Sequence, residues 1–69
     1  MADRIFQKTE VTGTSSQSIE EAIQNGIAKT AKSVKNLRWF EVVEIRGSID
    51  TDKVGQWQVT LKIGAALDD

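Results

Sequence analysis

The 69-residue sequence contains no cysteine, no histidine and no proline. The absence of cysteine excludes disulfides, thiolate nucleophiles and thiolate metal ligands, and the absence of histidine removes the commonest metal ligand and the commonest general base. A chain this short buries only about 60% of the surface that its unfolded form exposes, so its own core is marginal. Self-association, alone or with a bound organic ligand, is the remaining means of stabilisation. We therefore expect one domain over residues 1–69, without a metal site.

The charge balance excludes a second group of functions. Nine basic and ten acidic residues leave a formal net charge of −1, with no cluster of positive charge. Binding to a phosphate backbone needs such a cluster, so nucleic acid is not an expected partner. No apolar run approaches the roughly 18 residues of a membrane span, and the stretch MADRIFQKTE is too polar for a signal peptide. We expect a cytoplasmic protein with no membrane partner, a location that fits the absence of cysteine.

The first half of the chain predicts a strand followed by a helix. Residues 4–11 mix β-branched, aromatic and charged side chains as a short strand does, and TGTSSQS follows as a turn. Ser18 and Glu21 have the spacing of a capping box, with Ser15 or Ser16 as the alternative cap. From there apolar residues recur every three or four positions, which predicts an amphipathic helix of about 18 residues.

The second half predicts a β-hairpin. Residues 39–49 and 56–67 are both rich in β-branched and aromatic side chains, and DTDKVG between them has the composition of a hairpin loop. The order is therefore βαββ. We expect an α+β fold in which the helix packs on one face of a three-stranded antiparallel sheet.

Side-chain alternation divides the last strand into two faces. The residues that share a face with Trp57 are apolar: Val59, Leu61, Ile63, Ala65 and Leu67. Gln58 and Thr60 point the other way. We expect the Trp57 face to be the core face, packed under the helix, with Trp57 in a structural role.

The strand over residues 39–49 has apolar side chains on both faces, and one helix covers only one side of a small sheet. If Phe40 and Val42 join Trp57 under the helix, antiparallel pairing sets the composition of the uncovered face. That face then holds Trp39, Val43 and Ile45 beside Gln58 and Thr60.

Trp39 and Gln58 are the side chains with a chemical use on that uncovered face. An indole offers a flat surface on which a planar heteroaromatic ring can stack, and a carboxamide presents donors and an acceptor in one plane. Tryptophan is also enriched at subunit interfaces, so spacing alone leaves both a ligand platform and an interface residue open for Trp39.

An enzyme would have to rely on Glu41 and Glu44 as acid or base. Simple alternation sends these two carboxylates to opposite faces, and no metal ligands accompany them. We interpret them as solvated or ion-paired strand residues and expect no catalytic residue.

Three stretches, VTGTSSQSIEEAI, NLRWFEVVEIRG and WQVTLKIG, resemble the consecutive motifs of the dodecins, small flavin-binding proteins. The resemblance covers nearly the whole chain in order. It implies the same fold, assembled into a hollow dodecamer in which flavins lie in pairs at two-fold axes. The implied function is flavin storage, sequestration and photoprotective quenching, with FMN as the expected cofactor and riboflavin or FAD as alternatives.

The resemblance also implies the site residues. Trp39 matches the tryptophan that stacks on the isoalloxazine ring, and Gln58 matches the glutamine that hydrogen-bonds its pyrimidine edge. Arg46 matches an arginine associated with the ligand site in bacterial relatives. Alternation places Arg46 opposite Trp39, so it reaches a flavin held by another subunit, lies beyond a bulge, or forms a surface salt bridge.

One departure from the family pattern concerns a further ligand. Bacterial members commonly end the last strand with glycine, phenylalanine, arginine and leucine, whereas this chain has Ala65 and Ala66 at the middle two positions. The missing arginine argues against a coenzyme A contact there. The alternative to flavin binding is a ligand-free homo-oligomeric module in which Trp39 packs against its two-fold mate.

Overall fold

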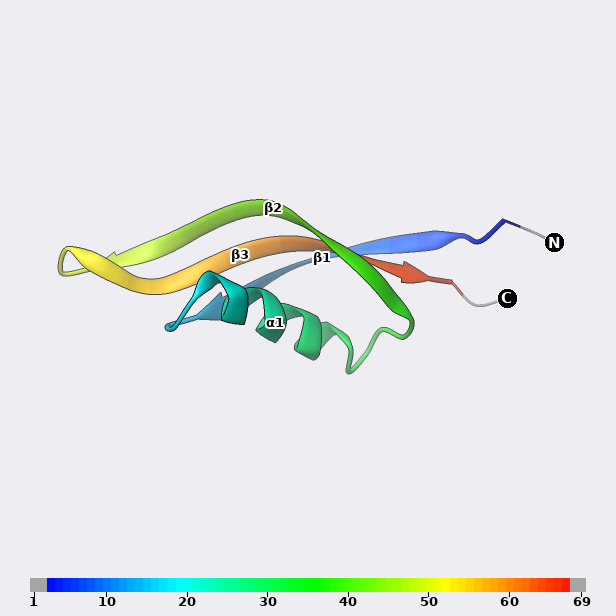
Figure 1. The fold of residues 1–69 in the computed structure, drawn as a ribbon, viewed down its shortest axis with the longest axis horizontal. Helices are drawn as coiled ribbons and strands as arrows, with labels where there is room; N and C mark the ends of the chain where they lie inside the picture. Colours follow the sequence, from blue (N-terminus) through cyan, green and yellow to red (C-terminus); the bar gives the residue numbers. More distant parts are fainter. Residues whose placement is uncertain (1–2, 68–69) are drawn as a thin grey trace.

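One helix and three strands follow each other in a computed structural model that describes residues 3–67. They are β1 (Phe6–Ser15), α1 (Ile19–Thr30), β2 (Leu37–Asp50) and β3 (Lys53–Ala66). The strands form one antiparallel sheet in the order β1-β3-β2, and α1 runs along one side of it (Figure 1). The predicted α+β fold with βαββ order is confirmed.

The helix begins at the predicted cap. The Glu21 amide donates to Ser18 Oγ over 3.0 Å, which satisfies one of the free donors of the first turn. The Glu21 carboxylate does not return to Ser18 as a capping box would; it accepts the hydroxyl of Ser15. Ser15 Oγ in turn accepts the amides of Gln17 and Ser18, so two serines share the capping.

The helix is shorter than the periodicity predicted, with 12 residues ending at Thr30. The Thr30 hydroxyl donates to the Gly26 carbonyl, and the amides of Lys32 and Ser33 then bond three residues back, to Lys29 and Thr30. The chain therefore leaves the α-helix through tighter turns, which an apolar repeat alone does not distinguish from a further helical turn.

A two-residue turn joins β2 to β3. Thr51 and Asp52 have φ values of 49° and 66°, the left-handed conformation that both central residues of a type I′ hairpin turn adopt. The hairpin extends past the ends of β1 and α1, so the molecule measures 56 Å along its longest axis (Figure 1). The predicted hairpin is confirmed, and both of its strands are longer than predicted.

The core lies between α1 and the middle strand, β3. Val59, Leu61 and Ile63 are buried against Ala22 of the helix, and Trp57 packs on this cluster while partly buried. The predicted core face of β3 and the structural role of Trp57 are confirmed, whereas Leu67, beyond the strand, is exposed.

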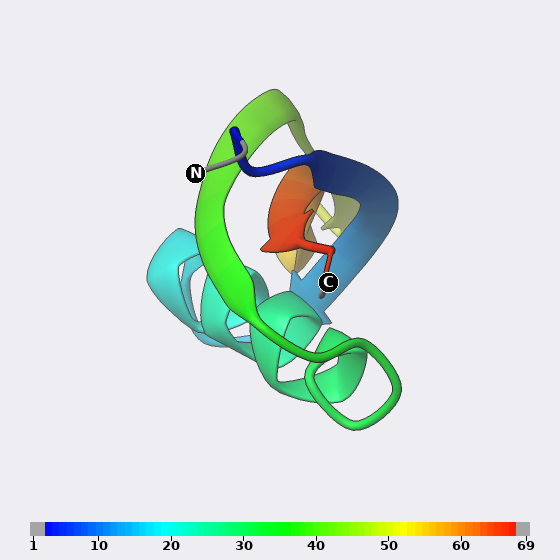
Figure 2. The same cartoon turned by 90° about the vertical axis from the view of Figure 1, so that its right-hand side faces the viewer.

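The helix does not cover Phe40 and Val42, although the assignment of the two sheet faces assumed that they join Trp57 under it. They pair with Ile63 and Leu61 and so face the helix side, but they stay 45% and 43% exposed. The reason is the strand order. Because β3 occupies the centre, with β1 and β2 on either side of it in the end-on view (Figure 2), a helix entered from β1 covers β1 and β3 and leaves β2 along the far edge.

A β-bulge in β2 changes which residues face the helix side. The register with β3 shifts between Val42 and Glu44, so Val43 is an extra residue. After it, Ile45 pairs with Val59 on the helix side and Arg46 pairs with Gln58 on the other. The prediction that Ile45 shares a face with Trp39 was wrong, because strict alternation does not hold across a bulge.

Candidate functional site

The sheet face turned away from α1, here called the open face, is built from rows of paired residues. These rows are Phe6 and Ala66; Lys8, Gly64 and Trp39; Glu10, Lys62 and Glu41; Thr12, Thr60 and Glu44; and Thr14, Gln58 and Arg46. All three predicted site residues, Trp39, Gln58 and Arg46, therefore lie on one face.

Trp39 lies across the middle strand at Gly64. A Cβ atom added to Gly64 would lie 2.3 Å from both Cε2 and Cζ2 of the indole and 2.5 Å from Cη2. Such similar distances to three consecutive ring atoms mean that the indole turns its face, not its edge, to the backbone of β3. The Phe6 ring lies in a T-shaped arrangement with the indole, with 5.1 Å between the ring centroids. The side chain stays 37% exposed.

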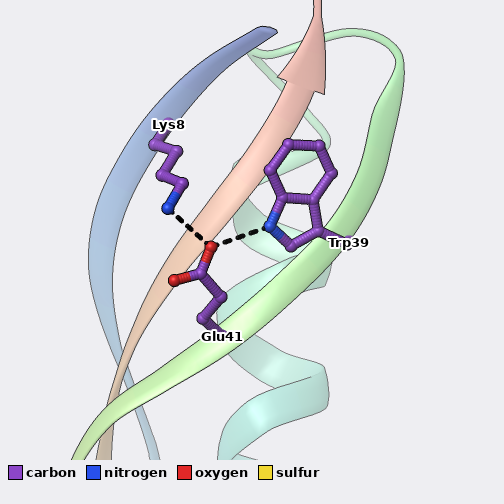
Figure 3. A network of polar contacts seen from close by, with 3 residues as sticks. All are labelled: Lys8, Trp39 and Glu41. Atoms are coloured by element: carbon purple, nitrogen blue, oxygen red, sulfur yellow. Dashed lines mark hydrogen bonds and ion pairs between the residues drawn. The ribbon is translucent and has the colours of Figure 1, made fainter.

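Glu41 anchors the polar edge of the indole. Trp39 Nε1 donates to Glu41 Oε2 over 2.9 Å, and the same oxygen pairs with Lys8 Nζ at 2.7 Å (Figure 3). The hydrogen bond from Lys8, followed by that from Trp39, holds the pKa of the Glu41 carboxyl below its usual range. Glu41 is thus an acceptor for two donors and is not available as a free general base.

Arg46 and Gln58 form a second polar group in the row nearer the hairpin turn. Arg46 Nε donates to Gln58 Oε1 over 2.7 Å, and Gln58 Nε2 donates to Gln56 Oε1 over 3.1 Å. The bulge at Val43 allows the hydrogen bond between Arg46 and Gln58, because without the extra residue Arg46 would point to the helix side. The alternative in which Arg46 lies beyond a bulge is confirmed. The prediction from simple alternation, which placed Arg46 on the face opposite Trp39, was wrong.

The same bulge brings Glu41 and Glu44 to one face, where alternation had separated them. They lie in adjacent rows, opposite Lys62 and Thr60. No group of histidine, cysteine, aspartate or glutamate side chains suited to a metal ion occurs among residues 3–67. Over the same described range, no helix is long and apolar enough to cross a membrane.

Gly64, Phe6 and Lys8 contact the site but were missed from the sequence. A glycine inside a strand is a recognised sign of close approach by another group, so Gly64 carried a usable signal. Phe6 and Lys8, two residues apart on β1, had no sequence feature that predicts a role in the site, because only the register with β3 brings them to Trp39.

Substitution of Gly64 tests the position of the indole. We expect Gly64→Ala to displace Trp39, because the added methyl would overlap the ring. The indole is partly exposed and can move, so the free energy of unfolding should change by less than about 1 kcal/mol. The measurement is Trp39 emission and anisotropy with Trp57 replaced by phenylalanine, which leaves one tryptophan.

Gly55→Ala is the matched control for this prediction. Its added Cβ would contact Asp50 and Ser48 near the hairpin turn and does not approach the indole. Gly55→Ala should leave Trp39 emission unchanged. An unchanged Trp39 spectrum in Gly64→Ala would contradict the observed ring position.

Similarity to known proteins extends over nearly the whole chain. A family model described as Dodecin matches residues 5–68. A dodecin of Thermus thermophilus is 41% identical over 66 residues, which covers 96% of each chain. The solved structure of dodecin from Streptomyces davaonensis is 40% identical with a TM-score of 0.94, covering 99% of this chain and 100% of that one. Dodecin from Streptomyces coelicolor is 36% identical, with a TM-score of 0.94 and coverage of 100% and 99%.

Proposed function

The chain belongs to the dodecin family of small flavin-binding proteins, and on that premise we propose that Trp39, Gln58 and Arg46 form a flavin site between subunits. The function is storage and sequestration of flavin bound in pairs, with quenching of its excited state. FMN is the proposed flavin, with riboflavin or FAD as alternatives. The observation that supports this most is the exposed indole held face-on over Gly64.

The residues present fit a planar heteroaromatic ligand. The indole face that touches β3 is supported by the strand backbone, which leaves the opposite face for stacking. Stacking between aromatic rings contributes about 0.5–1.5 kcal/mol beyond the area buried. Phe6 and Glu41 both contact the ring, which lowers the conformational freedom that Trp39 loses when a ligand stacks on it.

Trp39 and Gln58 of one chain are too far apart to serve one ring. Their rows on β3 are six residues apart, at Gly64 and Gln58, which corresponds to about 20 Å along a strand. A three-ring flavin system is much shorter than this. A flavin stacked on Trp39 would therefore receive its carboxamide from another subunit, which supports a shared site at a two-fold axis.

Arg46 acts on Gln58 in this proposal. By donating to Oε1 it fixes which end of the carboxamide is the acceptor, while Nε2 bonds Gln56. One lone pair of Oε1 and one hydrogen of Nε2 stay available for the donor and acceptor edge of a pyrimidine ring. Arg46 thus orients Gln58 and supplies positive charge to the site.

The uncovered helix-side face of β2 supports the proposed dodecamer. Phe40, Val42 and Ile45 each remain about half exposed on it, and Val43 beside them is also exposed. Contiguous apolar surface of this kind on a small chain marks a contact with another protein surface. Burial against neighbouring subunits also supplies the stabilisation that a 69-residue core lacks.

Quenching follows from the contact between the two ring systems. A bound flavin supplies the absorption of light and, once excited, an acceptor for an electron from the indole. The chain contributes the donor ring, its support at Gly64 and the exclusion of water on stacking. This scheme requires no catalytic residue. A cytoplasmic location remains a prediction, based on the cysteine-free composition.

A fluorescence titration tests the proposed function. The purified protein is added to FMN, to riboflavin and to FAD at fixed concentration, and flavin emission is followed. We expect most of the emission to be lost at saturation, with an apparent stoichiometry of one flavin per chain. Emission that stays unchanged for all three flavins would reject the proposal in favour of a ligand-free assembly module with Trp39 at an interface.

Coenzyme A provides a comparison in the same experiment. Ala66 pairs with Phe6 on the open face and is buried, so it offers no charge to a phosphate. We expect coenzyme A to leave the flavin titration unchanged. Displacement of flavin by coenzyme A would show that a different part of the chain binds it.

A further inference from the structure

Three strands meet at the Glu41 carboxylate. Glu41 and Trp39 lie on β2, Lys8 comes from β1, and the indole crosses β3 between them (Figure 3). A single oxygen, Oε2, receives both the indole N–H and the lysine ammonium. The contact therefore joins the two outer strands of the sheet through a charge.

The indole has few other restraints. Gly64 supports one face but has no side chain to prevent the ring from sliding, and Phe6 adds one T-shaped ring contact. The hydrogen bond from Nε1 to Glu41 is the one polar contact that the described structure gives this ring. Rotation about the side-chain torsions of Trp39 would break it, so its strength decides how firmly the ring is held.

We propose that Glu41 is the positioning residue of the flavin platform: its carboxylate, held by Lys8, keeps the Trp39 indole face-on over Gly64, so that flavin affinity depends on the charge of Glu41. This inference rests on the proposed function above and adds to it a residue and a pH dependence. Glu41 does not touch the ligand in this scheme, since it acts through the indole.

The charges around Glu41 set the direction of the pH effect. Lys8 faces it from β1 and Lys62 from β3, while Glu10 lies beyond Lys62 and Glu44 lies in the next row. The two lysines favour the charged carboxylate, and the pKa of Glu41 lies below the ordinary value of 4.5, chiefly because of Lys8. At pH values above 4.5 the Glu41 carboxylate is therefore charged and the indole is fully anchored. This anchoring is lost as the pH falls through the lowered pKa, because protonation removes the charge that both donors contact.

The first experiment uses the ligand-free protein. With Trp57 replaced by phenylalanine, Trp39 is the sole tryptophan, and its emission and anisotropy are followed from pH 7 to pH 3. We expect a transition with a midpoint below 4.5 that is absent in Glu41→Gln. Lys8→Met should move the midpoint up toward 4.5, because it removes the main cause of the shift. If Glu41 had only a structural role, the midpoint of the Trp39 transition would not move in Lys8→Met.

Glu44→Gln is the matched control, since it removes a carboxylate from the same strand and the same face without touching the indole. It should keep the wild-type transition. Circular dichroism and size-exclusion chromatography at each pH show that the fold and the assembly persist. A transition that survives in Glu41→Gln, or that disappears in Glu44→Gln, would overturn the inference.

The second experiment measures FMN affinity at pH 7. We expect Glu41→Gln to weaken FMN binding by about three- to tenfold, since the carboxamide keeps an acceptor for Nε1 but loses the charge, and Glu41→Ala to weaken it further. Wild-type affinity in both variants would reject the positioning role while leaving the proposed function intact. Failure of the wild-type protein to bind FMN, riboflavin and FAD would instead reject the proposed function, and the ligand-free titration would then still report whether Glu41 anchors the indole.

Discussion

Trp39→Ala is expected to abolish quenching of flavin emission and to weaken flavin binding by about 30-fold or more. This figure corresponds to the roughly 2 kcal/mol by which truncation of a tryptophan at the centre of a binding site typically weakens binding. The physical reason is that the indole supplies both the stacking surface and the electron donor. The measurement is a fluorescence titration with FMN, combined with a direct binding assay such as equilibrium dialysis that does not depend on quenching.

Two controls make the Trp39→Ala result specific. Trp57→Phe changes the other tryptophan, which packs on the core, and should retain quenching. Size-exclusion chromatography should give the same elution volume for Trp39→Ala as for the wild type. If Trp39→Ala loses the assembly, the loss of quenching would be explained by the loss of the assembly. That result would support the alternative in which Trp39 is an interface residue.

Gly13→Ala is expected to destabilise the fold by about 3 kcal/mol or to prevent folding. Gly13 lies where β1 crosses α1, and its added Cβ would lie 2.0 Å from the Ala22 carbonyl oxygen and 2.9 Å from the Gly26 amide nitrogen. Both atoms belong to the helix backbone, so no side-chain rotation relieves the overlap. The measurement is guanidinium denaturation at one fixed protein concentration, because assembly makes the apparent stability depend on concentration.

Gly26→Ala is the matched control on the facing element. Its added Cβ would meet Gly13 Cα and a Leu61 methyl at 3.4 Å, an ordinary van der Waals distance. Alanine also favours a helix interior over glycine by about 1 kcal/mol. We expect Gly26→Ala to be neutral or stabilising. At this crossing only a Cβ at Gly13 overlaps backbone atoms of the facing element. Equal losses of stability in Gly13→Ala and Gly26→Ala would contradict that observation.

The fold was predictable because its signals are local. The alternation of apolar residues on β3, the three- and four-residue repeat of α1 and the serine cap each depend on neighbouring residues. The capping residue Ser18 and the core role of Trp57 followed from these patterns. The end of the helix could not be predicted from these patterns, because the apolar repeat continues unchanged through the tighter turns that follow the helix.

The site was predicted in part. Trp39 and Gln58 were assigned to the uncovered face by alternation, and the register places them there. Arg46, Ile45 and Glu44 were assigned to the wrong faces, because one extra residue at Val43 reverses every later side chain and leaves no mark in the composition.

By itself the sequence determined the element order, the core face of β3, the absence of cysteine and histidine chemistry, and the motifs of the dodecin family. Only the tertiary structure decided that β3 is central, that β2 stays uncovered, and that Lys8 reaches the Glu41 oxygen that also accepts the Trp39 indole N–H. The physical reason is the range of the interactions involved. Periodicity and capping act within a few residues, whereas strand order, register and the Lys8–Glu41 contact join residues distant in the chain and exist only once the sheet has formed.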